Sequence, residues 1–324
     1  MKTTVVVPTF RRPRDLVRCL TALQQQATAP HEVIVVVRAD DAETWAALGT
    51  FPTAGLALKP QTVTQPGVVA AMNLGLEAAS GDIIAFTDDD AAPHPDWIAR
   101  LVAHFLQDSA VAGVGGRDLI QNPQPWFLGR SERVGQLQWH GRLIGNHHNG
   151  VGKAREVDIL KGVNMSFRRS AIGDLRFDTR LLGTGAQVHF EVVFCLALKR
   201  QGWKLIYDPD ILVDHHMSQR FDEDQRYQFN AVAYFNLVHN ETVAIAGYLS
   251  PLRQLTFLLW SILIGTRDAY GLAQSIRFSK RDGLTAWKKW WLCLKGRWQG
   301  WQTLQQSGSS RGASGVYPSM AQNP

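Results

Sequence analysis

Residues Gly81 to Asp96 read GDIIAFTDDDAAPHPD, and an apolar run in this stretch stops at three consecutive carboxylates. Residues 83–86 have the length and apolar character of a strand buried on both faces, as in a parallel sheet. Asp88, Asp89 and Asp90 would then stand at the carboxyl end of that strand, the edge at which open α/β sheets bind ligands. Residues two apart on an extended chain point the same way, so Asp88 and Asp90 are expected to face one ligand while Asp89 turns aside.

Three adjacent carboxylates repel one another, and a bound divalent cation removes that repulsion. Mg²⁺ and Mn²⁺ bind one or two carboxylates and complete their coordination with water and substrate phosphates. The Asp-x-Asp pattern therefore predicts that Asp88 and Asp90 hold Mn²⁺ or Mg²⁺ together with a phosphorylated co-substrate. A solvated acidic turn is the alternative for such a run, and the buried strand before it favours the metal site.

The segments before this stretch alternate buried strands with amphipathic helices. Strands are expected at residues 3–8, 31–38 and 59–64, and helices at residues 14–26, 44–48 and from 67 onward. This order predicts an α/β fold with a mostly parallel sheet, right-handed crossovers and helices on both faces. No G-x-G-x-x-G motif follows either of the first two strands, which disfavours a dinucleotide-binding fold.

The later segments are expected to continue the sheet and to supply further polar groups. We expect a helix at residues 97–107 and a strand at 111–115. A long loop region follows at 117–157, and a strand that enters a helix is expected at 160–169. A helix at 188–201, closed by Gly202, holds Glu191 in its first turn, where a carboxylate commonly serves only the helix dipole, worth roughly 0.3–1 kcal/mol. A last strand at 203–207 runs on toward His215, and a neutral imidazole is a good ligand for Mn²⁺ but a poor one for Mg²⁺.

Four segments, taken in this order, resemble family 2 glycosyltransferases with the GT-A fold. They are VVVPTFRRP at 5–13, the A-x-N-x-G pattern at 71–75, AFTDDDAAPHPDW at 85–97, and GTGAQVHFEVVFCLALKRQGWKLIYDP at 183–209, which precedes a histidine. The similarity covers about residues 2–216, which is most of the chain. It implies a nucleotide-binding sheet flanked by helices, followed here by a C-terminal helical extension.

The resemblance also implies roles for individual residues. Pro8, Thr9 and Arg11 would line the donor pocket, Asp40 or Asp41 would contact the base, Asp88 and Asp90 would bind the metal diphosphate, and His215 would be an accessory metal or phosphate ligand. Asn73 interrupts an apolar helix, and a donor-binding role for its amide stands beside a bond to a neighbouring loop. The family usually carries Glu-Asp where this chain has Phe190 and Glu191. Glu191 is the candidate catalytic base in spite of that departure.

The implied reaction is inverting transfer of a sugar from a nucleotide-sugar donor to a hydroxyl of a glycan or lipid-linked acceptor, in cell-surface polysaccharide synthesis. A single displacement needs no enzyme nucleophile, and none is assigned. A sugar nucleotidyltransferase is a rival, but its Gly-rich phosphate loop is missing, because Pro8-Thr9-Phe10 contains no glycine. A catalytically silent, membrane-bound nucleotide-sugar-binding protein is the other rival, and only Phe190 favours it.

The positive charge of the chain is concentrated near its C-terminus. The net charge of the 324 residues is +6, and residues 252–301 contain nine Lys or Arg against two Asp, so the charge does not indicate nucleic-acid binding. Five tryptophans alternate with these cations at positions 287, 290, 291, 298 and 301. This pairing predicts a helix lying on an anionic membrane surface, and a basic helix docked on the catalytic domain is the alternative. The apolar run at 255–265 is too short to span a bilayer.

These patterns divide the chain into three parts: a catalytic domain at 1–220, a helical membrane-associating extension at 221–306 and a disordered tail at 307–324. Three scattered cysteines indicate a reducing compartment, and the first strand leaves no room for a signal peptide. The expected location is therefore cytoplasmic, peripheral at the inner face of the plasma membrane.

Overall fold

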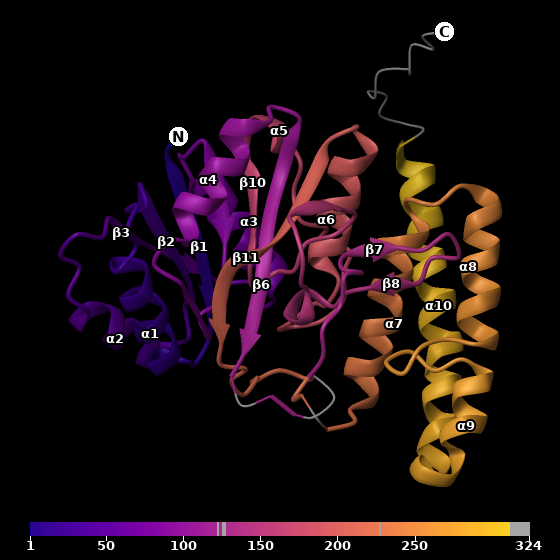
Figure 1. Cartoon of the computed structure of the whole chain (residues 1–324). Coiled ribbons are helices and arrows are strands. Elements are labelled where there is room, and N and C mark those ends of the chain that lie inside the picture. The colour runs from indigo at the N-terminus through magenta and orange to yellow at the C-terminus, as the bar shows by residue number, and fades with distance from the viewer. Residues whose placement is uncertain (122, 125–127, 227, 312–324) are drawn as a thin grey trace, which may run out of the picture.

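The computed structural model describes residues 1–121, 123–124, 128–226 and 228–311, and Figure 1 shows a sheet flanked by helices with a further group of helices at one end. The strands of the main sheet are β1 (Thr3–Thr9), β2 (Glu32–Arg38), β3 (Leu58–Val63), β4 (Ile83–Phe86), β5 (Ala91–Pro93), β6 (Val111–Ile120), β9 (Arg155–Val157), β10 (Met165–Arg168) and β11 (Lys204–His215). Strands β7 (Gln136–Leu137) and β8 (Leu143–Ile144) pair separately. The helices are α1 (Pro13–Gln24), α2 (Ala42–Thr50), α3 (Val68–Ala78), α4 (Trp97–Gln107), α5 (Arg169–Ile172), α6 (Phe190–Arg200), α7 (Ala231–Ala246), α8 (Pro251–Leu263), α9 (Leu272–Asp282) and α10 (Leu284–Arg311), with the 3-10 turn η2 (His147–Asn149).

The strand order is β3-β2-β1-β4-β10-β6-β11-β5, with β9 also paired to β11. Strands β3, β2, β1 and β4 are mutually parallel, β10 runs antiparallel to β4 and β6, and β11 runs parallel to β6. The predicted α/β class and mostly parallel sheet are therefore confirmed. Strands β1, β2 and β4 were also expected at these positions in the chain.

Both faces of the sheet are buried, as the apolar strands predict. Successive side chains of β1 alternate between the faces, so Val6 packs into one core with helices α3 and α6, while Val5 and Val7 pack into another with α1 and α4. All three valines have no exposed surface. The two cores fix the position of β1 and β4, whose carboxyl ends carry the polar groups of interest.

Two regions differ from the sequence-based expectation. The region 117–157 was expected to be loop, but β6 continues to Ile120, and β7, β8 and β9 lie within the region. Strand β11 was expected at 203–207 and instead runs without a break to His215. The pairing register of β11 with β6 shifts between Asp208 and Leu212, and this irregularity carries the strand past Pro209.

The C-terminal helices form a layer beside the sheet domain (Figure 1). Helix α7 packs against α6, and its Val243 and Ala244 belong to the same core as α3 and α6. Helix α10 lies along α7 and α9. Residues 307–311, predicted as the start of a tail, are the last turn of α10, and 312–324 lie outside the described residues. None of the helices in the described ranges combines the length and the apolar content that crossing a bilayer would need.

Candidate functional site

The carboxyl ends of β1, β4 and β11 lie at the same edge of the sheet. Strands β1 and β4 are parallel neighbours, and β4 and β6 are both antiparallel to β10, so β11, which is parallel to β6, runs in the same direction as β4. Thr9 ends β1, Asp88 follows β4 by two residues and His215 ends β11. Residues far apart in the sequence thus meet at one edge, where open sheets bind ligands.

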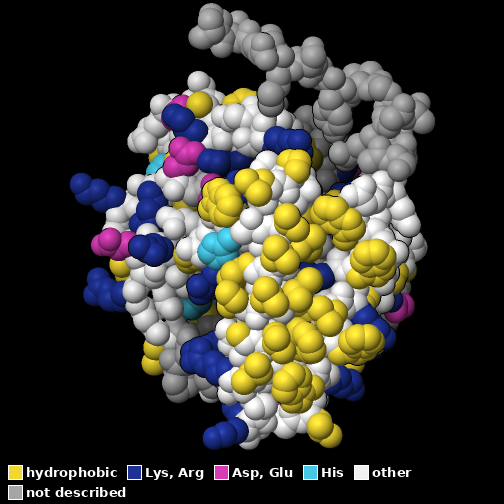
Figure 2. Space-filling view, turned by 90° about the vertical axis from the view of Figure 1, so that its right-hand side faces the viewer, with side chains coloured by type: hydrophobic (Ala, Val, Ile, Leu, Met, Phe, Trp, Pro, Cys, Tyr) yellow, Lys and Arg dark blue, Asp and Glu magenta, His cyan; other side chains and the backbone are white. Residues whose placement is uncertain are grey.

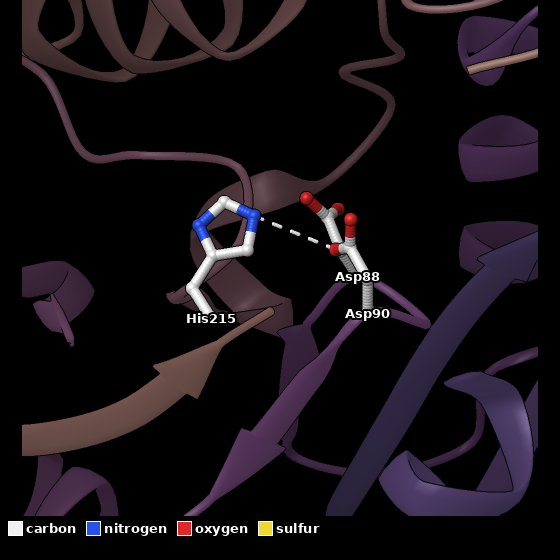
Figure 3. A group of neighbouring side chains, drawn as sticks. All are labelled: Asp88, Asp90 and His215. Carbon is white, nitrogen blue, oxygen red and sulfur yellow. Dashed lines mark ion pairs between the residues drawn. The ribbon is translucent and has the colours of Figure 1, made fainter. Parts of the chain in front are cut away.

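The pairing of β5 with β11 brings His215 to the aspartates. Strand β5 begins directly after Asp90, and its Ala91 is paired with His215. The backbone N–H of His216 also donates to the carbonyl of Asp90 at 2.8 Å. As a result, one ligand atom each from Asp88, Asp90 and His215 lies within 4.8 Å of the others (Figure 3).

The free atoms of this cluster suit a divalent cation. Oδ2 of Asp90 accepts hydrogen bonds from the backbone N–H of Ser218 and from Arg12, both at 3.0 Å. Oδ1 of Asp90 and Nε2 of His215 are 3.5 Å apart, and neither has a hydrogen-bond partner within the described ranges, although both are buried. Buried polar atoms without partners are uncommon, and a cation between them would satisfy both. Asp88, Asp90 and His215 therefore fit the metal that the sequence predicted.

A second set of residues orients the histidine. Nδ1 of His215 lies 3.2 Å from Oδ2 of Asp118, which also accepts from Nζ of Lys161 at 2.5 Å. Burial disfavours the charged imidazole, but the nearby carboxylates of Asp118 and Asp90 outweigh it and raise the pKa of His215. A carboxylate on one ring nitrogen that leaves the other nitrogen free is the usual arrangement around a metal-binding histidine. Neither Asp118 nor Lys161 was identified from the sequence.

Asp89 is not part of the cluster, as expected, but Asp89 and Asp90 lie in a turn and not in extended chain. Its Oδ2 accepts from the hydroxyl of Thr9 at 2.7 Å, and Nη2 of Arg12 lies 2.7 Å from its Oδ1. Asp89 has no exposed surface. It therefore fixes Arg12 and the end of β1, while Asp88 and Asp90 remain with His215.

A cavity of about 560 Å³ opens over this edge of the sheet. Pro8, Thr9, Asp88, Glu191 and His215 all line it. Five Lys or Arg side chains also line it: Arg12, Arg38, Lys161, Arg220 and Arg226. These cationic side chains lie beside the candidate metal-binding cluster. Such a set is suited to a nucleoside diphosphate, whose phosphate oxygens accept charge-assisted hydrogen bonds.

Glu191 occupies the first turn of α6 and faces this cavity. Burial raises the pKa of its carboxyl group, and nearby Asp88 adds to the increase, against the opposing effect of His189. A carboxylate whose pKa is raised is better matched to accepting a proton near neutral pH. Phe190, which departs from the family pattern, packs against Phe177 with 5.7 Å between ring centroids, so it contributes to the core.

Four of the predicted donor-binding residues, Arg11, Asp40, Asp41 and Asn73, are not among the residues that line the cavity. Arg11 is exposed, and its backbone N–H donates to Asp41, which also caps α2 through the N–H of Thr44. Asp40 is exposed and forms a bidentate ion pair with Arg38. The arginine of the motif at 5–13 that lines the cavity is therefore Arg12, the residue next to Arg11.

Asn73 also lies away from the cavity lining. Its amide nitrogen donates to the carbonyl of Phe177 at 2.9 Å, and its amide oxygen accepts from the N–H of Phe177 at 2.8 Å. This is the alternative in which the amide bonds to a neighbouring loop. The pair of hydrogen bonds holds the segment before α6 against α3, and so supports the wall that carries Glu191.

Comparison with known proteins identifies the family. The profile of Glycosyl transferase family 2 matches residues 4–176, which is more than half of the chain. The chain belongs to glycosyl transferase family 2. Family membership confirms the resemblance and shows that the protein is a nucleotide-sugar-dependent glycosyltransferase, which decides against a sugar nucleotidyltransferase.

Individual relatives support the same conclusion. The chain is 32% identical over 290 residues to Glycosyltransferase AglE of Haloferax volcanii, covering 88% of this chain and 87% of AglE. It is 26% identical over 225 residues to Glucosyl-dolichyl phosphate glucuronosyltransferase of the same organism, covering 67% and 70%. Among solved structures it resembles the mannosyltransferase PcManGT from Pyrobaculum calidifontis in complex with GDP-Man and Mn²⁺, with 19% identity, a TM-score of 0.51, and 98% and 76% of the chains covered. The fold is therefore of the GT-A type.

Proposed function

We propose that this family 2 glycosyltransferase transfers a sugar, with inversion, from a nucleotide-sugar donor to a hydroxyl of a glycan or lipid-linked acceptor. One observation carries the proposal: the Asp88 and His215 side chains of the metal-binding cluster and the Glu191 carboxylate line the same cavity. Asp88, Asp90 and His215 would hold Mn²⁺ or Mg²⁺, and the histidine favours Mn²⁺. A bound cation there acts as a Lewis acid toward the leaving diphosphate.

The residues of this chain support a single displacement. Glu191 accepts the proton of the acceptor hydroxyl as that oxygen forms a bond to the anomeric carbon. The bond from the anomeric carbon to the diphosphate breaks in the same step, and the electron pair leaves with the diphosphate. Arg12, Lys161 and Arg226 line the cavity and would bind the charge that develops there.

The C-terminal helices support an acceptor held at a membrane. Figure 2 shows apolar side chains gathered over the side of the molecule formed by α8, α9 and α10. We call this surface the apolar face and define it by exposed residues of α8 and α10: Leu255, Leu259, Leu263, Trp287, Trp291 and Trp298. Within each helix these side chains are spaced so that they lie on one side. Apolar surfaces of this kind mark interaction sites.

Charge selects the partner of the apolar face. Helices α8, α9 and α10 carry many Lys and Arg residues and, between 252 and 301, only two Asp, so an anionic lipid surface is complementary to them. A protein whose relatives include a dolichyl phosphate glycosyltransferase would meet a lipid-linked acceptor at such a surface. We therefore propose a peripheral position at the inner face of the plasma membrane, in the synthesis of a cell-surface polysaccharide.

The structure changes which of the predicted residues would contact lipid. The indole N–H of Trp290 donates to the carbonyl of Ile262, so this tryptophan joins α10 to α8. Nζ of Lys289 lies 3.4 Å from Asp282 and 4.5 Å from the ring centroid of Tyr270. Both residues contact protein, and the tryptophans at 287, 291 and 298 are the ones that would insert.

The reaction is tested by incubating the purified protein with a panel of nucleotide sugars and Mn²⁺, with EDTA as the comparison. We expect hydrolysis of at least one donor, and binding of its nucleoside diphosphate that EDTA abolishes. If the protein binds a donor in calorimetry but neither hydrolyses nor transfers it, the catalytically silent alternative is correct. Equal donor binding with EDTA would remove the metal site.

A further inference from the structure

A second cavity, of about 440 Å³, adjoins the donor cavity. The two cavities share five lining residues: Ala186, Val188, Asp222, Leu237 and Asp268. Of these, Ala186 and Val188 lie just before α6, whose first turn holds Glu191. A molecule in the second cavity can therefore extend toward the candidate base without leaving the protein surface.

The walls of the second cavity come mostly from the C-terminal half of the chain. They include α7, the segment after β11, the connection between α8 and α9 at residues 267–268, and Lys289 of α10. All of these lie outside residues 4–176, to which the family profile matches. The same helix α10 carries Trp287 and Trp291 of the apolar face. The second cavity thus lies between the reaction site and helices of the proposed membrane surface.

The lining of the second cavity suits a polyhydroxylated ligand. It combines two aromatic rings, those of Phe229 and Tyr234, with amide side chains at Gln187, Gln228, Asn230, Asn236 and Asn240. The amides of Gln187 and Asn240 bond to backbone groups through both their oxygen and their nitrogen. The amide oxygen of Asn230 caps α7, and the amide nitrogen of Asn236 donates to Glu223. The amide groups that remain for a ligand in the described ranges are therefore Gln228, the nitrogen of Asn230 and the oxygen of Asn236, beside the flat apolar surface of the two rings. Ligand sites in proteins commonly combine apolar walls with a few placed polar groups.

Asp268 lies at the junction of the two cavities. No group in the described ranges donates a hydrogen bond to its carboxylate or lies within ion-pair distance of it, while its own backbone N–H donates to Thr266. Asp268 is among the exposed residues, and it lines both cavities, so a ligand in either cavity can reach its carboxyl group. A carboxylate at this junction is free to accept a hydrogen bond from a ligand.

We propose that the second cavity binds the sugar end of the acceptor and that the carboxylate of Asp268 accepts a hydrogen bond from one of its hydroxyl groups. This proposal rests on the proposed function, because it assigns the acceptor of that reaction to a defined part of the chain. Asp268 is an acceptor-binding residue here, and Glu191 keeps the role of base. The C-terminal helices then bind both the membrane and the sugar that the membrane presents.

Binding of simple glycosides tests the site without any turnover. The probes are methyl glycosides of glucose, mannose, galactose and N-acetylglucosamine, followed by saturation-transfer NMR on the full chain. We expect at least one to bind the wild type. Ala233→Trp, which fills the second cavity from α7 but does not touch the first, should abolish this signal, whereas Ala103→Trp on the exposed side of α4 should not. No binding to the wild type, or binding unchanged in Ala233→Trp, overturns the proposal.

Asp268→Asn tests the named residue. Hydrogen bonds to charged groups contribute about 1.5–3 kcal/mol, so the dissociation constant of the glycoside, and the KM for an acceptor, should rise by roughly tenfold or more. The exposed Asp174→Asn is the matched control. Calorimetric binding of the nucleoside diphosphate with Mn²⁺ should be the same in all variants. If the wild type does not bind the nucleoside diphosphate, the proposed function is contradicted. An unchanged acceptor KM in Asp268→Asn would contradict only the role of Asp268.

Discussion

The donor site and the C-terminal helices depart from the usual distribution of residues in opposite ways. At the end of β4, Asp90 is 0% exposed, and its Oδ1 has no hydrogen-bond partner in the described ranges. On α8 and α10, Leu255 is 55% exposed and Trp298 is 64% exposed. Charges are normally solvated and large apolar side chains are normally buried, so both arrangements cost free energy in the isolated protein. The two regions motivate the two proposals made above: a cation and a diphosphate bound at the end of β4, and a lipid surface at the apolar face.

The largest effect is expected from the metal-binding cluster. Asp90→Asn removes a charged ligand atom beside His215 and should lower sugar transfer by roughly a thousandfold, since Lewis-acid stabilisation of the leaving group is worth several kcal/mol. Asp88→Asn should act in the same way. Calorimetric titration of the nucleoside diphosphate with Mn²⁺ measures the loss directly.

Asp89→Asn separates metal binding from packing. Because Asp89 contacts Thr9 and Arg12 and is not part of the cluster, this variant should keep Mn²⁺-dependent binding but melt at a lower temperature. If Asp89→Asn loses binding while Asp88→Asn and Asp90→Asn retain it, the buried aspartates have been assigned to the wrong roles.

The next effect concerns the candidate base. Glu191→Gln keeps the shape of the side chain but cannot accept the acceptor proton, so we expect donor binding to be retained and transfer to fall by roughly 10²–10⁴-fold. Single-turnover transfer, measured beside nucleoside diphosphate binding, tests both parts. A variant that transfers sugar at close to the wild-type rate would mean that another group accepts the proton.

Substitutions in the apolar face should weaken vesicle binding and leave the donor site unchanged. Changing Trp287, Trp291 and Trp298 together to Ala removes the inserting rings, so flotation with anionic vesicles should be lost while donor binding persists. Leu106→Ala, an exposed apolar residue of α4, is the control.

Salt divides the two contributions to membrane binding. The screening length falls from about 10 Å at 0.1 M to 3 Å at 1 M, so high salt should release part of the wild-type protein and leave the part held by tryptophan. Wild-type protein that stays at the bottom of the gradient at low salt would show that the apolar face contacts protein instead of lipid.

The smallest expected effect is on stability and concerns Glu32, a buried carboxylate whose hydrogen-bond donors all belong to the protein. Glu32 is 1% exposed and accepts hydrogen bonds from Thr4, Ser80 and Lys59, which lower its pKa to about 2 against the cost of burial. Since the folded pKa lies below the ordinary 4.5, this stabilisation is present above pH 4.5 and is lost as the pH falls toward 2.

Glu32→Gln removes that pH dependence. We expect it to lower the free energy of unfolding by about 1–3 kcal/mol at neutral pH and to leave donor binding unchanged. Denaturant unfolding at pH 7 and pH 3 should show the difference between the variant and the wild type shrinking at the lower pH. A difference that grows on acidification would mean that Glu32 is protonated in the folded protein at neutral pH.

Local sequence patterns were sufficient for the order of the elements and for part of the site. The apolar run before Asp88 predicted β4, because burial on both faces demands a continuous apolar strand. The Asp-x-Asp spacing predicted that Asp88 and Asp90, without Asp89, form the cluster, although a turn and not an extended chain separates them in this arrangement. The helix with Glu191 was also located, because Gly202 ends it. These features depend on residues close together in the chain.

Contacts between distant segments decided the rest. His215 reaches Asp90 because β5 pairs with the end of β11, and Asp118 and Lys161 orient its ring from β6 and the segment before β10. No local pattern encodes that register. For the same reason the sequence analysis assigned Arg11 to the donor pocket, whereas Arg12 lines the cavity. The direction of each side chain depends on the turn that follows β1.

The C-terminal helices show the same division. Their composition predicted a basic, tryptophan-rich surface, because residue type alone determines charge and apolar area. Which tryptophans face outward was decided by packing: Trp290 donates to Ile262 of α8, while Trp287, Trp291 and Trp298 remain exposed beside the leucines of α8. The sequence thus determined the chemistry that each segment can offer, and the tertiary structure determined which side chains meet, because neighbours in space are set by strand register and helix packing.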